Sequence, residues 1–353
     1  MTISYETQLL AVDPLGPAPE RVALAADVLR RGELVAFPTE TVYGLGANAF
    51  DPEAVARIFA AKRRPTSDPL IVHIHALDQL EAIVRAVPQG ALALVRRYWP
   101  GPLTLVMPRG QRIPPNVSAG MDSVAVRMPD HPVALALLRA AGLPVAAPSA
   151  NLFTRPSPTT AAHVMHDLAG RIPMVLDGGP TRIGLESTVV SLLGPRPELL
   201  RPGGIPIEDL RAALPDLLYQ PRYVAEDHAA AAPGQMLKHY APDAPVLLYR
   251  GPRAAALASM LAEVRARLAQ GQRVGALVGD EDAALFREAG ALVASLGSCA
   301  NLAEVGARLF AGLRALESTV DVMVVRSFEQ GGLGLAIWDR LLRATEGHVI
   351  EVG

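Results

Sequence analysis

The chain has very little cysteine and no long apolar run. Cys299 is the single cysteine in 353 residues, which excludes an intrachain disulfide framework and a zinc site built on several thiolates. No uncharged apolar stretch reaches the roughly 18 residues that a membrane span needs, so we expect no membrane contact. The N-terminal stretch MTISYETQLLAVDPLG lacks the basic and apolar regions of a signal peptide. We therefore expect a soluble, cytoplasmic protein.

Charge is also scarce. Charged residues make up 19% of the chain, below the roughly one quarter of an average soluble protein. The formal net charge is −2, so any contact with nucleic acid would need a local basic patch. Half of the residues are apolar, which indicates a well-buried globular protein, and 353 residues exceed what one hydrophobic core usually serves. Two domains are therefore expected.

Short apolar runs alternate with stretches of helical periodicity over the first 200 residues. Asp51 as N-cap and Pro52 at the first helical position predict a helix over 51–64. Other helices are predicted over 20–31, 77–98, 130–141 and 159–170, and strands over 34–37, 69–74, 102–108, 123–129, 144–151, 173–179 and 187–193. This alternation predicts an α/β fold with one long sheet.

The pattern changes near residue 215. Residues 215–244 have no steady period and several prolines, as expected of a linker or a functional lid. From 245 to 353, strands and helices alternate quickly, which predicts a small three-layer domain with a parallel sheet.

Several familiar catalytic motifs are missing or incomplete. GLGANA (44–49) resembles a dinucleotide fingerprint, but no acidic residue closes a second strand at the expected distance. The chain has no G-x-x-x-x-G-K-[ST], no H-E-x-x-H, no Ser-His-Asp order and no paired acids of a glycosidase. His163 and His166 are three residues apart without a third metal ligand nearby, so they are interpreted as surface residues. What remains is chemistry based on positioning and charge neutralisation, such as transfer at a phosphate.

Polar residues gather in four stretches at strand and helix ends. Each has an ordinary structural explanation, such as cations that complement a helix C-terminus or helix capping by Ser157 or Thr159. Jointly they supply hydroxyls, an amide, a lysine and guanidiniums, the groups that bind phosphate and carboxylate. They are PTETVYGLG (38–46), AKRRPTSDPLIVHI (61–74), VAAPSANLFTRPSPTT (145–160) and GLESTVVSLL with LLRPGG (184–204).

Together these stretches resemble one protein family. GELVAFPTETVYGLGANA, the K-x-R of KRRP, IVHI, PSAN with PSPT, STVV and LRPGG occur in the order of the YrdC-like domain of threonylcarbamoyl-AMP synthases, over about residues 20–210. KHYAP (238–242) and the α/β segment after it resemble the long two-domain form of these enzymes. The resemblance implies a twisted, open mixed sheet in a YrdC-like catalytic domain at 1–214. It further implies a linker or lid at 215–244 and a smaller Rossmann-like α/β domain at 245–353.

The resemblance also implies an activity. Such an enzyme would be an L-threonylcarbamoyladenylate synthase, a nucleotidyltransferase that converts L-threonine, bicarbonate and ATP with Mg²⁺ into threonylcarbamoyl-AMP and pyrophosphate. Other proteins would then transfer the threonylcarbamoyl group to the tRNA adenosine beside the anticodon. The implied threonine contacts are Thr41, His73, Arg127, Ala147 and Ser187. The implied ATP-side residues are Lys62, Arg64, Asp68, Ser123, Ser149, Asn151, Ser157, Arg201 and the linker residue Tyr240, with Lys62 and Arg64 also neutralising charge as pyrophosphate leaves.

Two departures from the family pattern concern this site. Asp68 stands where the family usually has Asn, and its carboxylate could hold magnesium or point away. Phe153 and Thr154 replace Ser-Gly in S-A-N-x-S-G-x-P-S-P-T, so the loop could have a different shape. Two alternative functions stay open at this point. One is an RNA-binding module that uses a basic concave face, and the other is a carbamoyltransferase that forms carbamoyl-AMP.

Overall fold

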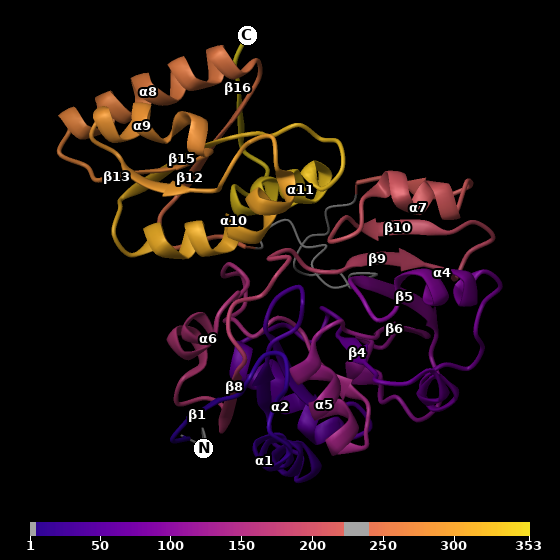
Figure 1. Cartoon of the computed structure of the whole chain (residues 1–353). Helices are drawn as coiled ribbons and strands as arrows, with labels where there is room; N and C mark the ends of the chain where they lie inside the picture. The colour runs from indigo at the N-terminus through magenta and orange to yellow at the C-terminus, as the bar shows by residue number, and fades with distance from the viewer. Residues whose placement is uncertain (1–4, 222–239) are drawn as a thin grey trace. The chain divides into compact units, whose positions relative to one another are not determined.

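The computed structural model describes residues 5–221 and 240–353, which divide into two compact units (Figure 1). Unit 1 takes the described residues up to 153, 157–182 and 186–221, and unit 2 takes 154–156, 183–185 and 240–353. Most of the predicted linker at 215–244 lies outside the described residues, including Lys238 and His239 of the KHYAP motif.

Unit 1 is built on an 11-stranded mixed sheet in the order β1-β8-β2-β3-β7-β4-β6-β5-β9-β10-β11. Parallel pairs such as β4–β6 stand beside antiparallel pairs such as β5–β6. This confirms the predicted α/β class with an open mixed sheet. The strands are β1 (Gln8–Ala11), β2 (Val35–Phe37), β3 (Gly44–Asn48), β4 (Ile71–His73), β5 (Leu103–Pro108), β6 (Ser123–Arg127), β7 (Val145–Ala146), β8 (Met174–Asp177), β9 (Thr188–Ser191), β10 (Glu198–Arg201) and β11 (Leu218–Tyr219).

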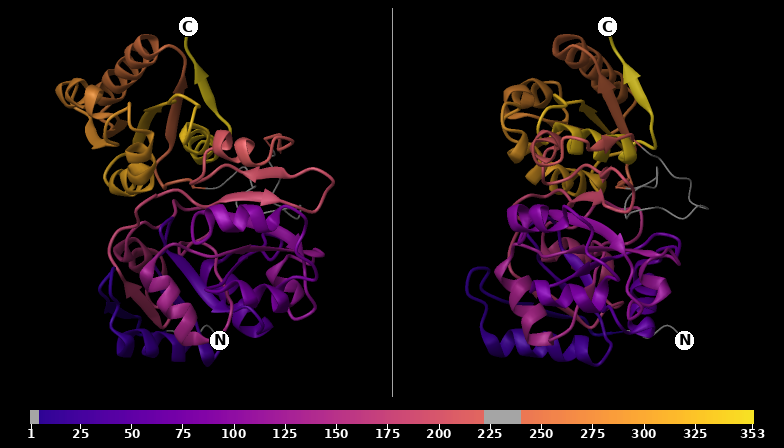
Figure 2. Two further views of the ribbon diagram at one scale, coloured as in Figure 1. Left: turned by 45° about the vertical axis from the view of Figure 1, so that its right-hand side comes forward. Right: turned by 90° about the vertical axis from the view of Figure 1, so that its right-hand side faces the viewer.

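The helices of unit 1 cover this sheet. Asp51 caps α2 as predicted, because its carboxylate accepts from the backbone amides of Glu53 and Ala54. Helices α1 and α5 pack on each other and on β2, β7 and β8 through one apolar cluster (Figure 2). The helices are α1 (Pro19–Arg30), α2 (Pro52–Lys62), α3 (Leu80–Ile83), α4 (Ala91–Tyr98), α5 (Pro132–Ala141), α6 (Ala161–Leu168) and α7 (Ile207–Ala213), with the 3₁₀ turns η1 (Leu77–Gln79) and η2 (Pro115–Val117).

Some local predictions were wrong. The helix predicted over 77–98 is interrupted between α3 and α4, where Pro88 disfavours helix and Gly90 has φ +86°. Thr160 caps α6, in place of Ser157 or Thr159. The glycines of GLGANA lie within strand β3, where a Cβ on Gly46 would stand 2.7 Å from Val145 Cγ1 and 2.8 Å from Phe37 Cε1. Gly46 therefore permits close packing between protein side chains.

Unit 2 has a five-stranded sheet in the order β14-β13-β15-β12-β16, with every pair parallel. Helices α8 and α9 pack on one face and α10 and α11 lie on the other (Figure 1), which confirms the predicted three-layer arrangement. The elements are β12 (Val246–Arg250), α8 (Arg253–Ala269), β13 (Val274–Val278), α9 (Asp280–Glu288), β14 (Leu292–Ser295), α10 (Leu302–Glu317), β15 (Val322–Arg326), α11 (Gly334–Ala344) and β16 (Val349–Glu351). Across the described part of both units, none of the helices has the length and apolar character needed to cross a membrane.

Candidate functional site

The loop between β2 and β3 reaches the guanidinium at the end of β6. Arg127 donates from Nη1 to Thr41 Oγ1 at 3.0 Å and from Nη2 to Glu40 Oε1 at 2.6 Å. The Arg127 and Glu40 side chains are 4% and 1% exposed, so this ion pair is buried. Burial lowers the pKa of Arg127, and the charge of Glu40 opposes that shift. The arrangement fixes a guanidinium in a water-poor place, as a carboxylate-binding site requires.

The hydroxyls of this loop form a chain with a defined direction. Thr39 donates to the carbonyl of Val42 at 2.6 Å, so its single proton is used there. Thr39 and Thr41 hydroxyls lie 2.7 Å apart, and Thr41 must therefore be the donor in that bond. Because Thr41 accepts from Arg127 and donates to Thr39, it can offer a ligand only a lone pair.

His73 lies directly beside Arg127. The register of β4 and β6 pairs these two residues, and the His73 ring packs edge-on against Phe37 with centroids 6.1 Å apart. Burial lowers the pKa of His73 to about 3, and the neighbouring charge of Arg127 adds to this shift. His73 is therefore neutral at physiological pH. The amide of Ala147 donates to the carbonyl of Ile71 at 2.9 Å, which places the start of the PSAN segment beside β4.

Lys62 joins the end of α2 to the PSAN segment. Its ammonium donates to the carbonyls of Ser149 at 2.6 Å and Asn151 at 2.5 Å, and Lys62 is 1% exposed. The same segment runs along the start of β3, because Leu45 N donates to Pro148 O at 2.8 Å and Ala150 N donates to Tyr43 O at 2.8 Å. The loop that carries Thr41 and the loop that carries Ser149 are thus held together by backbone hydrogen bonds.

Arg64 and Asp68 form a second buried ion pair. Nη2 of Arg64 lies 2.9 Å from Oδ2 of Asp68, and the side chains are 3% and 0% exposed. Arg64 also donates to the carbonyls of Asp68 at 3.2 Å and Pro69 at 2.9 Å. Asp68 therefore faces Arg64 in this structure, and a role in holding magnesium stays a prediction.

The third predicted cation, Arg201, meets the start of β9. It donates to the carbonyl of Ser187 at 2.9 Å and to the Ser187 hydroxyl at 3.1 Å, while that hydroxyl lies 2.7 Å from Thr104 Oγ1. A Cβ on Gly203 would stand within 2.4 Å of the backbone of Ser187, so the Arg-Pro-Gly-Gly turn packs directly on this residue. Nearby in the sequence, Glu186 accepts from Ser157 Oγ at 2.5 Å.

Two predicted residues lie apart from these contacts. Ser123 begins β6, at the opposite end of the strand from Arg127, and pairs there with Pro108. Tyr240 belongs to unit 2, where it is 1% exposed and its ring packs on Phe310 with centroids 5.2 Å apart. The guanidinium carbon of Arg340 lies 5.4 Å from the centre of the same ring. A role for Tyr240 over the nucleotide stays a prediction.

Comparisons with known proteins identify the family of this chain. A sequence-family model described as "Telomere recombination" matches residues 27–203, and one described as "Threonylcarbamoyl-AMP synthase, C-terminal domain" matches residues 205–345. Threonylcarbamoyl-AMP synthase of Bacillus subtilis is 46% identical over 96% of this chain and 97% of its own length. The chain belongs to the threonylcarbamoyl-AMP synthase family.

Further relatives of this family extend the match. Threonylcarbamoyl-AMP synthase of Pyrococcus abyssi is 43% identical over 94% of this chain and 96% of its own length. The crystal structure of P. abyssi Sua5 complexed with L-threonine superposes with a TM-score of 0.91 at 42% identity, covering 98% of this chain and all of that one. Neither alternative function considered from the sequence is favoured by these matches.

Sequence reasoning missed three residues that contact the candidate site of this threonylcarbamoyl-AMP synthase family member. Glu40 and Glu186 are the buried carboxylates that hold Arg127 and Ser157, and Thr104 supports Ser187. Glu40 carried a usable signal, since it is the single charge in the apolar and hydroxyl-rich stretch LVAFPTETVYG. The partners of the other two lie 29 and 83 residues away, so no local pattern points to them.

One departure from the family pattern retains a backbone conformation that suits glycine. Thr154, where the family has Gly, adopts φ +72°, the left-handed conformation that favours glycine. Its carbonyl accepts from Ala241 N at 2.7 Å within unit 2, and the preceding Phe153 N donates to Lys62 O at 2.8 Å. The loop therefore adopts a glycine-like turn although it carries a β-branched residue.

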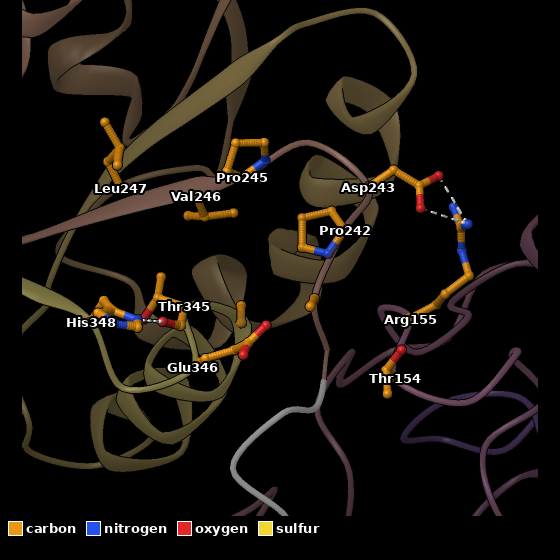
Figure 3. A pocket seen from close by; sticks show the side chains of 12 residues that line it. Thr154, Arg155, Pro242, Asp243, Pro245, Val246, Leu247, Thr345, Glu346 and His348 are labelled. Carbon is orange, nitrogen blue, oxygen red and sulfur yellow. Dashed lines mark hydrogen bonds and ion pairs between the residues drawn. The ribbon is translucent and has the colours of Figure 1, made fainter.

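Unit 2 also has an open pocket of about 660 Å³ (Figure 3). Apolar side chains of 241–247 line one part of it, and the other part is polar, with Glu346 and His348 after the end of α11. Arg155 reaches Asp243 at 2.9 Å on one side. The residues predicted to bind threonine or ATP do not line it. We therefore assign it no role in the family's reaction.

Proposed function

We propose that this protein makes threonylcarbamoyl-AMP and pyrophosphate from L-threonine, bicarbonate and ATP. Family membership over nearly the whole chain supports the reaction. The observation that carries the proposal is the buried Arg127, fixed by Thr41 and Glu40 beside a neutral His73. A fixed guanidinium is suited to a substrate carboxylate, and the relative that was crystallised with L-threonine supports that amino acid as the substrate.

The reaction has two bond-forming steps. The ammonium of bound threonine first loses a proton to water. The neutral amine then attacks the carbon of bicarbonate, and a hydroxyl leaves as water to give the carbamate. A carbamate oxygen then bonds to the α-phosphorus of ATP as the bond from that phosphorus to the bridging oxygen of pyrophosphate breaks. Lys62 and Arg64 would neutralise the charge that moves to pyrophosphate. Ser149, Asn151, Ser157 and Arg201 remain the proposed contacts on the ATP side.

Magnesium would enter with ATP, held by its phosphates. Asp68, the carboxylate considered for it, is committed to Arg64 at 2.9 Å. Elsewhere in the part of the chain that the structure describes, His, Cys, Asp and Glu form no group of three or more that could hold a metal ion. A magnesium ion bound chiefly by substrate phosphates fits this lack of a carboxylate cage. Its chemistry would be charge neutralisation on the phosphates.

The product would serve tRNA modification. In this proposal, separate proteins transfer the threonylcarbamoyl group to the adenosine next to the anticodon, and contact of this chain with RNA is weak. A net charge of −2 is consistent with that division of labour.

Pyrophosphate release tests the proposal. Purified protein with ATP, L-threonine, bicarbonate and Mg²⁺ should release pyrophosphate, and omission of threonine or of bicarbonate should each abolish it. A release rate that does not respond to threonine would refute the proposed substrate. Release that needs carbamoyl phosphate in place of threonine and bicarbonate would instead support the carbamoyltransferase.

A further inference from the structure

The Glu40–Arg127 ion pair is incomplete. Removing two charges from water is costly, and a buried pair is stable only when the remaining donors and acceptors are also satisfied. Arg127 uses two N–H groups, one toward Glu40 and one toward Thr41. Within residues 5–221 and 240–353, however, buried Nε of Arg127 and buried Oε2 of Glu40 have no hydrogen-bond partner.

These two atoms are one donor and one acceptor of opposite charge in a single ion pair. An unsatisfied buried polar group costs about 1–3 kcal/mol, and more when it is charged. An unsatisfied buried group in a native structure calls for an explanation, and a ligand that satisfies both atoms would recover this cost on binding. A ligand that satisfies both atoms has to present an acceptor to Arg127 and a donor to Glu40, and groups of matching charge, anionic and cationic, suit them best.

An α-amino acid has this combination of groups on one carbon atom. Its carboxylate can accept from Arg127, whose guanidinium favours planar carboxylates. Its ammonium can donate to Glu40, and to Thr41, whose hydroxyl offers only a lone pair. Neutral His73 adds no charge that would disturb this balance.

We propose that Glu40 binds the substrate directly: its Oε2 accepts a hydrogen bond from the ammonium of L-threonine while Arg127 Nε donates to the carboxylate. This inference rests on the proposed function, in which threonine is the substrate. Glu40 thereby selects α-amino acids against α-hydroxy acids, which carry the same carboxylate but no ammonium.

Binding of two probes tests this selection. The probes are L-threonine and 2,3-dihydroxybutanoate of matching stereochemistry, each titrated calorimetrically into the full-length protein. The wild-type protein should bind threonine at least tenfold more tightly than the hydroxy acid. In Glu40→Gln the amide oxygen can still accept from Arg127, but the group facing the ammonium becomes a donor. Threonine affinity should fall at least tenfold, hydroxy-acid affinity should stay within threefold, and the preference should disappear.

Glu53→Gln is the matched control, since Glu53 is an exposed glutamate of the same unit, and it should retain the wild-type preference. A wild-type protein that binds the two probes equally would overturn the inference even if Glu40→Gln fails to fold. An unchanged preference in a folded Glu40→Gln would overturn it as well. The proposed function itself would be refuted by a different result: a wild-type protein that binds the hydroxy acid, does not bind threonine, and releases no pyrophosphate when threonine is supplied.

Discussion

The substitution Asp68→Asn distinguishes two roles for the Asp68 carboxylate, which departs from the family pattern: ion-pair partner of Arg64, or ligand of magnesium. Asn has nearly the same size and is the residue the family usually has, so the substitution removes charge with little change in volume. The Arg64–Asp68 contact is 2.9 Å long and almost fully buried, and Arg64 keeps two backbone carbonyls as acceptors after the change. Loss of the carboxylate charge beside a buried guanidinium is expected to lower the free energy of unfolding by about 1.5–3 kcal/mol, because the charge of Arg64 then keeps only neutral acceptors.

For a unit of this size, that loss corresponds to a fall in Tm of about 3–12 °C. Scanning calorimetry measures the fall, and pyrophosphate release titrated with Mg²⁺ measures the metal requirement, which should not change. Asp122→Asn is the control, because the Arg85–Asp122 pair at 3.1 Å has side chains 61% and 71% exposed. An exposed pair is worth about 0–1 kcal/mol, so its Tm should hardly move. An unchanged Tm together with a tenfold higher Mg²⁺ requirement in Asp68→Asn would refute the ion-pair interpretation.

Three further substitutions test other parts of the site. Lys62→Ala should lower the rate of pyrophosphate release more than tenfold, which corresponds to about 1.4 kcal/mol of barrier. The control Arg63→Gln changes an exposed residue and should leave the rate within threefold of wild type. A Lys62→Ala rate equal to that of the wild-type protein would show that Lys62 takes no part in the reaction. The depressed pKa of His73 costs stability only below pH 6.5, where the unfolded chain gains a proton that the folded chain does not until about pH 3. Between pH 6.5 and 3, the free energy of unfolding of the wild-type protein should therefore fall, as the pH is lowered, by about 1.4 kcal/mol per pH unit more than that of His73→Gln. Urea titrations at several pH values measure both, and an equal pH dependence of the two proteins would show that His73 is not buried in its neutral form. Thr154→Gly should raise the free energy of unfolding by about 0.5–1 kcal/mol, because it removes left-handed strain at φ +72°, and a lower Tm would contradict this.

Features set by neighbouring residues in the chain were predictable. Asp51 and Pro52 mark the start of α2 whatever else the fold does. The apolar runs predicted as strands at 102–108 and 123–129 contain β5 and β6, because their length and β-branched content suit buried strands. The α/β class of both units follows from such local signals. The interruption at 84–90 also has a local signal, in Pro88 and Gly90, that the helix prediction did not use. The bridge of Val84 with Arg109, by contrast, depends on tertiary structure.

Sequence reasoning identified the cations of the site but not the groups that hold them. Arg127 was predicted from its motif, yet its carboxylate comes from a loop 87 residues away, and the partner of Ser187 lies on a strand 83 residues away. Such pairs are brought together by strand order and register, which the sequence does not display locally. The structure therefore adds the electrostatic balance of the site, and that balance has a functional consequence.

Arg64 and Arg127, which are both predicted to contact substrate, are each paired with a buried carboxylate of the protein itself. The pairs hold the guanidiniums in place, so binding costs little side-chain ordering. They also reduce the attraction for a simple anion, because each carboxylate repels it. A ligand gains full advantage only if it satisfies the carboxylate as well as the arginine. At Arg127 that condition favours a zwitterion over an organic acid, and free acids in the cell would compete poorly with threonine for this site.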